Sequence, residues 1–114
     1  MNKFAAMKQK NAIDSEILLI TQEECAEVTQ AISKVFRFGM DDEYNGQTNR
    51  EHLEEEIGDL MCMIDLLIEN GIISEAACLT AKNEKLNKLM TWSGIFKERV
   101  CLALVELPSD RNAC

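Results

Sequence analysis

Four acidic residues interrupt the apolar stripes of two helical segments, and their spacing suits the binding of a divalent metal ion. Glu24 and Glu27 lie three residues apart in one segment. Glu56 and Asp59 have the same spacing in the other. Side chains at i and i+3 leave the same face of a helix. Carboxylates that face a core are costly unless they are paired or bind a metal. The four therefore predict one or two hard cations, Mg²⁺ or Mn²⁺, because such ions prefer oxygen ligands.

Two other interpretations compete with this metal site. Most glutamates form a solvated helix face, and spacing alone leaves that interpretation open. The four acids differ from ordinary surface acids because apolar residues continue their stripes on both sides. A di-iron carboxylate site generally needs Glu-x-x-His on its helices. The only histidine, His52, follows Asn49 by three residues, so the sequence lacks this motif.

Helices are the elements expected to position these acids. A period of about 3.6 residues in the apolar pattern predicts a first helix over Asp14–Phe38. Thr21 and the glutamate three residues later match a capping box that could start the helix later. Residues 1–12 are either a helical lead-in or frayed. Gly39 ends this helix, and an acidic loop follows over residues 39–47.

Three more helices are expected, each preceded by a capping residue. No segment shows strand alternation, so the fold class is all-α, a bundle of four or five helices. We expect one domain over residues 1–114, with residues 109–114 as a loose tail after Pro108. The capping residues are Thr48 for a helix to Asn70 that Gly71 ends, Ser74 for a helix to about Met90, and Ser93 for a shorter fourth helix.

The apolar period also predicts which residues of the first two helices face inward. In both rows, acids replace apolar residues in the middle. The first row reads Ile17, Ile20, Glu24, Glu27 or Val28, Ala31 and Val35, and the second reads Leu53, Glu56 or Ile57, Leu60, Ile64 and Leu67.

Composition limits the possible partners. The chain has 114 residues and a net charge of -8, with 20 acidic against 12 basic residues. This balance argues against a nucleic-acid polymer, which normally requires a basic surface. It allows a small phosphate ligand, since a bound cation reverses the local charge. No apolar run is long enough to span a membrane. The five cysteines form no CxxC pair, which predicts free thiols in a cytoplasmic protein.

Two short motifs carry a resemblance to a known family. They read EECAE over Glu23–Glu27 and EIGD over Glu56–Asp59, with 28 residues between them. This order is similar to the signature of the MazG-like all-α nucleoside triphosphate pyrophosphohydrolases, Glu-Glu-x-x-Glu followed by Glu-x-x-Asp. The resemblance covers roughly residues 17–90. The gap between the motifs is long for the family, which the acidic loop would explain.

The resemblance implies hydrolysis of a nucleotide between its α and β phosphates, giving a nucleoside monophosphate and pyrophosphate. The catalytic, metal-binding acids carry over to Glu24, Glu27, Glu56 and Asp59. Glu23 would stand in a supporting shell, because it lies about 100° off the inward row. The nucleophile would be a water molecule activated at the metal, with a carboxylate of the cluster taking its proton.

A second pattern supplies candidate substrate-binding residues. Asn83, Lys85 and Lys88 resemble the Asn-x-Lys-x-x-Arg-Arg pattern of many MazG-type domains. Cations there can neutralise charge on the polyphosphate. Lys88 stands where arginine is usual, and Leu89 replaces the second arginine. An ordinary solvated lysine face is the alternative. Lys34 and Arg37 have a simpler explanation, because cations are favourable at a helix C-terminus.

The second helix predicts self-association. Apolar residues between Leu60 and Ile68 cover most of its circumference, and a chain of this size offers little cover for such a helix. We expect a homodimer or homotetramer, as in the family. The leading hypothesis is a Mg²⁺-dependent pyrophosphohydrolase of NTPs or dNTPs. Two alternatives stay open, a phosphoribosyl-ATP pyrophosphohydrolase and a non-catalytic helical module that binds a protein partner.

Overall fold

The chain forms helices joined by short turns in the computed structural model, which describes residues 2–92 and residue 94. It divides into two compact units, Met1–Ile73 and Ser74–Cys114. The first unit contains α1 (Lys3–Phe38), β1 (Glu43–Tyr44), β2 (Gln47–Thr48) and α2 (Asn49–Glu69). The second contains α3 (Glu75–Trp92). This mostly helical content confirms the all-α prediction in outline, while the expected fourth helix from Ser93 lies outside the described residues.

Helix α1 begins eleven residues before its predicted start at Asp14 and absorbs most of the ambiguous lead-in. Asn2 caps it, because its side-chain oxygen accepts a hydrogen bond of 2.9 Å from the Ala5 N–H. Thr21 is an interior residue whose hydroxyl donates to the Ile17 carbonyl at 2.7 Å, so the later capping box is excluded. The helix ends as predicted at Gly39, which has a φ of 90°.

The loop after α1 contains a small antiparallel hairpin, which corrects the prediction that no segment forms a strand. Glu43 pairs with Thr48, and Tyr44 pairs with Gln47. The two residues between the strands, Asn45 and Gly46, have φ values of 53° and 77°. An Asn-Gly pair favours this kind of two-residue turn, because both positions need a positive φ. The dipeptide was the sequence signal for the hairpin.

Backbone and side-chain hydrogen bonds fix the hairpin against both helices. The Asn49 N–H donates to the Asp42 carbonyl and the Arg50 N–H donates to the Met40 carbonyl, each at 3.0 Å. The buried Asn49 side chain donates to the Gly39 carbonyl at 2.8 Å. Asn49 therefore ties the end of α1 to the start of α2.

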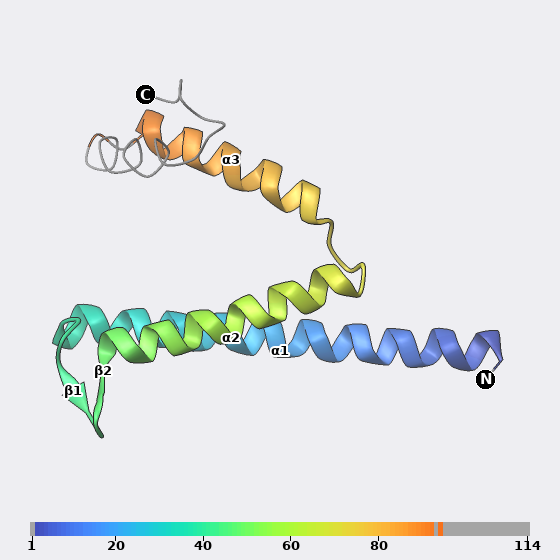
Figure 1. The fold of residues 1–114 in the computed structure, drawn as a ribbon, viewed down its shortest axis with the longest axis horizontal. Helices are drawn as coiled ribbons and strands as arrows, with labels where there is room; N and C mark the ends of the chain where they lie inside the picture. Colours follow the sequence, from blue (N-terminus) through green and yellow to red (C-terminus); the bar gives the residue numbers. More distant parts are fainter. Residues whose placement is uncertain (1, 93, 95–114) are drawn as a thin grey trace. The chain divides into compact units, whose positions relative to one another are not determined.

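Helix α2 runs antiparallel to α1 within the first unit (Figure 1). Thr48 caps it as predicted, since its hydroxyl accepts from the Glu51 N–H at 3.1 Å. It ends at Asn70 and Gly71, where Gly71 has a φ of 69°. Lys10 of α1 reaches this end and donates to the Asn70 carbonyl at 3.2 Å.

We call the line of contact between α1 and α2 the seam. Its residues recur at steps of three and four, which is similar to the spacing of a coiled-coil interface. All of them are buried or half-buried. The seam consists of Ile17, Ile20, Glu24, Val28, Ala31 and Val35 on α1 and of Asn49, Leu53, Glu56, Leu60, Met63 and Leu67 on α2.

The seam settles the open positions of the two predicted rows. Val28 is half-buried and Glu27 is exposed, so Val28 occupies the inward place. On α2, Met63 is buried and Ile64 is exposed, which makes the prediction for Ile64 wrong. The reason is the spacing of the inward residues on α2, whose steps alternate between four and three. The step of four from Glu56 to Leu60 is therefore followed by a step of three, which leads to Met63.

The apolar core of the first unit lies toward the C-terminal end of α2. Ile17, Met63 and Leu67 are buried there, each 7% exposed. Four half-buried residues pack against them, and two of these come from the turn after α2. They are Ile20, Leu66, Ile72 and Ile73.

Helix α3 belongs to the second unit and is described by itself. Ser74 caps it as predicted, because its hydroxyl oxygen accepts from the Ala77 N–H at 3.2 Å. The helix ends at Trp92, two residues beyond the expected end. Within the part of the chain that the structure describes, none of the helices combines the length and the apolar content that crossing a membrane requires.

Candidate metal centre and adjoining pocket

Three of the four predicted metal ligands come together in the middle of the seam. Glu24 of α1 faces Glu56 and Asp59 of α2, and one carboxylate oxygen from each lies within 4.8 Å of the others. Glu24 and Glu56 are half-buried seam residues, while Asp59 lies one turn further along α2 and is exposed. The antiparallel pairing of the two helices produces this meeting.

The charges of the cluster act on Glu24. Its partial burial raises the pKa of Glu24 above the ordinary value of 4.5. The nearby negative charges of four acids raise it further, in the order Asp59, Glu56, Glu27 and Glu23. Burial and like charges both disfavour the ionised carboxylate. A cation between these groups would remove the repulsion.

The donor set and its dimensions fit a small hard cation. All three groups offer carboxylate oxygens, the ligands that Mg²⁺ and Mn²⁺ prefer. Two oxygens bound to one Mg²⁺ lie about 3 Å apart when adjacent and about 4 Å apart when opposite, given bonds of about 2.1 Å. Oxygens within 4.8 Å of one another need only small side-chain movements to reach that geometry.

Glu27 and Glu23 lie near this cluster without belonging to it. Both side chains are exposed. Their charges nevertheless contribute to the raised pKa of Glu24, so they are close enough to influence the centre. Their assignments, Glu27 as a fourth ligand and Glu23 as a supporting residue, stay predictions.

His52 is a site residue that the sequence interpretation missed. Its Nε2 lies 3.1 Å from Oε1 of Glu56, one helical turn further along α2. The Glu56 side chain is 12% exposed, and that of His52 is 22% exposed. The sequence interpretation used His52 only to exclude a di-iron site. The i,i+4 spacing of His52 and Glu56 was the signal that could have identified the contact.

The comparison with protein families agrees with this geometry. The family model of the MazG nucleotide pyrophosphohydrolase domain matches residues 14–88, about two thirds of the chain. The chain belongs to the MazG family. It is therefore a hydrolase that acts on the phosphoanhydride bonds of nucleotides. Searches of curated proteins and of solved structures gave no match.

The matched residues of this MazG domain include every predicted site residue, from Glu23 to Lys88. Three of these belong to α3, namely Asn83, Lys85 and Lys88, and all three are exposed there. Helix α3 lies in the second unit, whereas the acidic cluster lies in the first. Their role in binding the substrate stays a prediction.

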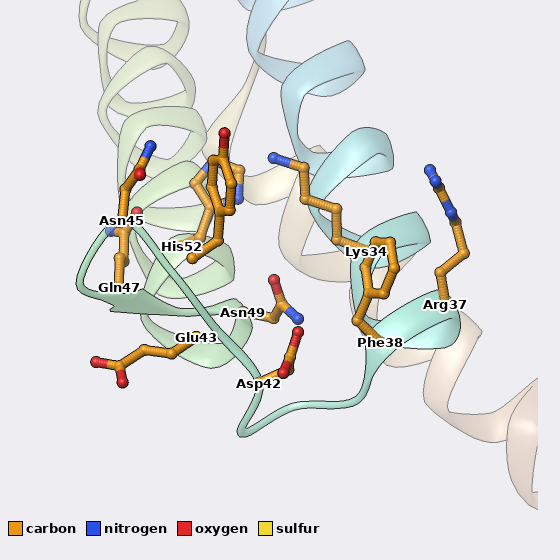
Figure 2. Close-up of a pocket in the computed structure, with 10 residues that line it drawn as sticks. Lys34, Arg37, Phe38, Asp42, Glu43, Asn45, Gln47, Asn49 and His52 are labelled. Carbon is orange, nitrogen blue, oxygen red and sulfur yellow. The ribbon is translucent and has the colours of Figure 1, made fainter.

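A pocket of about 480 Å³ adjoins the acidic cluster of the MazG domain. It lies between the end of α1, the hairpin and the start of α2 (Figure 2). His52 contributes to its wall and also contacts Glu56, so it connects the pocket with the acidic cluster. The other lining residues are Lys34, Arg37, Phe38, Asp42, Glu43, Tyr44, Asn45, Gln47 and Asn49.

Proposed function

We propose that this MazG protein is a Mg²⁺-dependent pyrophosphohydrolase that converts NTPs or dNTPs to the monophosphate and pyrophosphate. The acidic cluster carries the proposal: three carboxylates from two helices meet in the seam of a chain that belongs to this family. Family membership favours this hydrolase over a non-catalytic protein-binding module, and Mn²⁺ is the expected substitute for Mg²⁺.

In the proposed mechanism, Glu24, Glu56 and Asp59 hold the cation, with Glu27 as the fourth ligand. A bound Mg²⁺ ion supplies positive charge to the phosphate oxygens and makes a nearby water more acidic. A carboxylate of the cluster accepts the proton of the attacking water, which requires it to lie within hydrogen-bond reach. Glu23 supports the ligands from outside the seam.

His52 has a positioning role in this proposal. With Nε2 protonated, it donates to Oε1 of Glu56 across 3.1 Å. The hydrogen bond restricts the rotamer of Glu56 and leaves its other oxygen available to a cation. Groups that orient metal ligands in this way commonly affect metal affinity by about 10- to 100-fold.

The polyphosphate requires cationic partners that the acidic cluster does not offer. We assign this role to Lys85 and Lys88, with Asn83 as a hydrogen-bond donor. Amino groups near the bridging oxygens would stabilise the charge that develops as pyrophosphate leaves. Lysine supplies this charge without the bidentate geometry of arginine.

Self-association is part of the proposal. Ile57, Met61 and Ile64 form an exposed apolar stripe along α2, and Met61 is 60% exposed. A contiguous apolar stripe on a helix favours burial against another surface. We propose that a second copy of the chain covers this stripe in a homodimer or homotetramer.

A reducing cytoplasmic setting suits the exposed thiols of Cys25, Cys62 and Cys78.

The deciding experiment measures pyrophosphate release from a panel of NTPs, dNTPs and phosphoribosyl-ATP, with Mg²⁺ and with EDTA. We expect Mg²⁺-dependent formation of a nucleoside monophosphate and pyrophosphate in equal amounts. Preference for phosphoribosyl-ATP would select that alternative enzyme. Formation of a diphosphate and inorganic phosphate, or absence of turnover with every nucleotide, would refute the proposed reaction.

A further inference from the structure

We propose that the pocket beside the metal centre holds the nucleoside part of the substrate, its base and sugar. This inference rests on the proposed function, because it assumes that the phosphates of the nucleotide lie at the acidic cluster. It adds a binding site for the remainder of the molecule. The hairpin, which lies outside the acidic motifs, supplies four of the ten residues that line the pocket.

The position of the pocket follows from the seam. Toward the C-terminal end of α2, the buried residues Ile17, Met63 and Leu67 fill the seam. Toward the hairpin, the pocket opens, and His52 lies one turn, about 6 Å along the axis, from Glu56. A nucleotide with its phosphates at the cluster can therefore extend along the seam toward the hairpin and not toward the core.

The lining residues offer contacts for a base. Phe38 and Tyr44 supply aromatic faces, and the Arg37 guanidinium lies 4.9 Å above the Phe38 ring. Bases stack on aromatic and guanidinium planes with little dependence on sequence. The Tyr44 side chain is 75% exposed, while its backbone is held by pairing with Gln47 in the hairpin. An exposed ring on an ordered hairpin is available to a ligand.

The charges of the pocket argue against the polyphosphate as its occupant. Lys34 and Arg37 are offset by the carboxylates of Asp42 and Glu43, which also line the pocket. Two anions in the wall repel a phosphate chain, whereas a neutral base and sugar tolerate a mixed lining. The volume of about 480 Å³ lies within the range of about 300–1,000 Å³ that is usual for small-molecule pockets.

Steady-state kinetics with Tyr44→Ala test the inference. Loss of one stacked base contact corresponds to roughly a tenfold weaker interaction. We expect KM for the best nucleotide to rise about tenfold with kcat changed less than about twofold, because the reacting phosphates are distant. Tyr44→Phe keeps the ring and should retain the wild-type KM. Phe36→Ala is the matched control, since Phe36 is 86% exposed on α1 and does not line the pocket.

Inorganic tripolyphosphate is the second probe, because it has the phosphates without the nucleoside. As a competitive inhibitor it should bind wild type and Tyr44→Ala equally well. Equal weakening of tripolyphosphate and nucleotide would make the pocket a phosphate site and overturn the inference. An unchanged KM for Tyr44→Ala in an active enzyme would also overturn it and leave the proposed function intact. A wild-type protein without turnover would instead overturn the proposed function, on which the inference depends.

Discussion

Two stretches of the seam have inward residues of opposite character, apolar in one and acidic in the other. At one end, Ile17 of α1 packs with Met63 and Leu67 of α2 and forms the core of the first unit. In the middle, Glu24 and Glu56 occupy equivalent inward places, and Asp59 completes a cluster of carboxylates. Both stretches belong to the same two helices.

The difference between the two stretches shows that the position of a side chain and its effect are decided separately. The repeat of three and four residues decides which side chains face the partner helix, whatever their chemistry. The residue type then decides the result: apolar side chains stabilise the pair, whereas the carboxylates repel one another and raise the pKa of Glu24. Acids that face one another in inward places are therefore a functional signal, and each test below acts on one side of this contrast.

Replacing an inward acid should abolish the reaction and spare the fold. Glu56→Gln removes a ligand charge at a nearly unchanged volume. We expect kcat/KM for pyrophosphate release to fall at least about 100-fold, or about 2.7 kcal/mol of transition-state stabilisation. The measurement is nucleotide turnover in saturating Mg²⁺, together with a urea unfolding curve in EDTA.

Glu54→Gln is the matched control, since Glu54 is an exposed glutamate on the same helix. It should leave turnover within about twofold of wild type, as surface substitutions generally have small effects. A Glu56→Gln variant that folds and retains full activity would remove Glu56 from the metal centre.

Replacing an apolar seam residue should give the reverse result. Leu67→Ala removes a side chain that is 7% exposed, and such cavities cost about 2–5 kcal/mol of unfolding free energy. We expect a loss at the low end of that range, because the core is small. Urea unfolding measures it, while turnover per folded molecule at low temperature should stay near wild type. A stability loss below about 0.5 kcal/mol would mean that Leu67 is not a core residue.

The outward stripe of α2 should control association. Met61→Glu places a charge at a residue that is 60% exposed in the single chain. If a second copy covers the stripe, burying this charge is unfavourable, and the assembly should dissociate at micromolar concentration. Sedimentation equilibrium measures the mass of the wild-type and variant assemblies directly. An exposed charge swap elsewhere, Glu69→Lys, serves as the control. A wild-type mass equal to the monomer at every concentration would refute the assembly.

The smallest effect concerns pH. In the metal-free folded protein the pKa of Glu24 is raised above 4.5, so the folded state binds this proton more tightly than the unfolded state. The resulting stability is present below the ordinary pKa and is lost as the pH rises through the raised one. Urea unfolding in EDTA from about pH 4 to about pH 8 should show this loss for wild type. Glu24→Gln should show less of it, and identical pH profiles would contradict the account.

Much of the fold and of the candidate site was predictable from the sequence. Capping residues such as Thr48 and Ser74 mark helix starts, because their side chains satisfy free N–H groups. The pairing of Glu24 with Glu56 followed from two apolar periods with acids in their middle. These signals are local, so a sequence carries them directly.

Other features depend on contacts that no period encodes. The choice of Val28 over Glu27 depends on how α1 packs against α2, because both residues fit the apolar period of the sequence. The hairpin was missed because its strands have two residues each, too short for any alternation. The pocket could not be predicted, because it forms only where this hairpin joins the end of α1 to the start of α2.

Direct titration of Mn²⁺ into the metal-free protein, followed by electron paramagnetic resonance, tests the central claim that the seam acids bind a divalent cation. The account predicts saturable binding to wild type and to Glu54→Gln, competition by Mg²⁺, and at least about tenfold weaker binding to Glu24→Gln and Glu56→Gln. Binding of equal strength in all four proteins, or no binding to wild type, would contradict it.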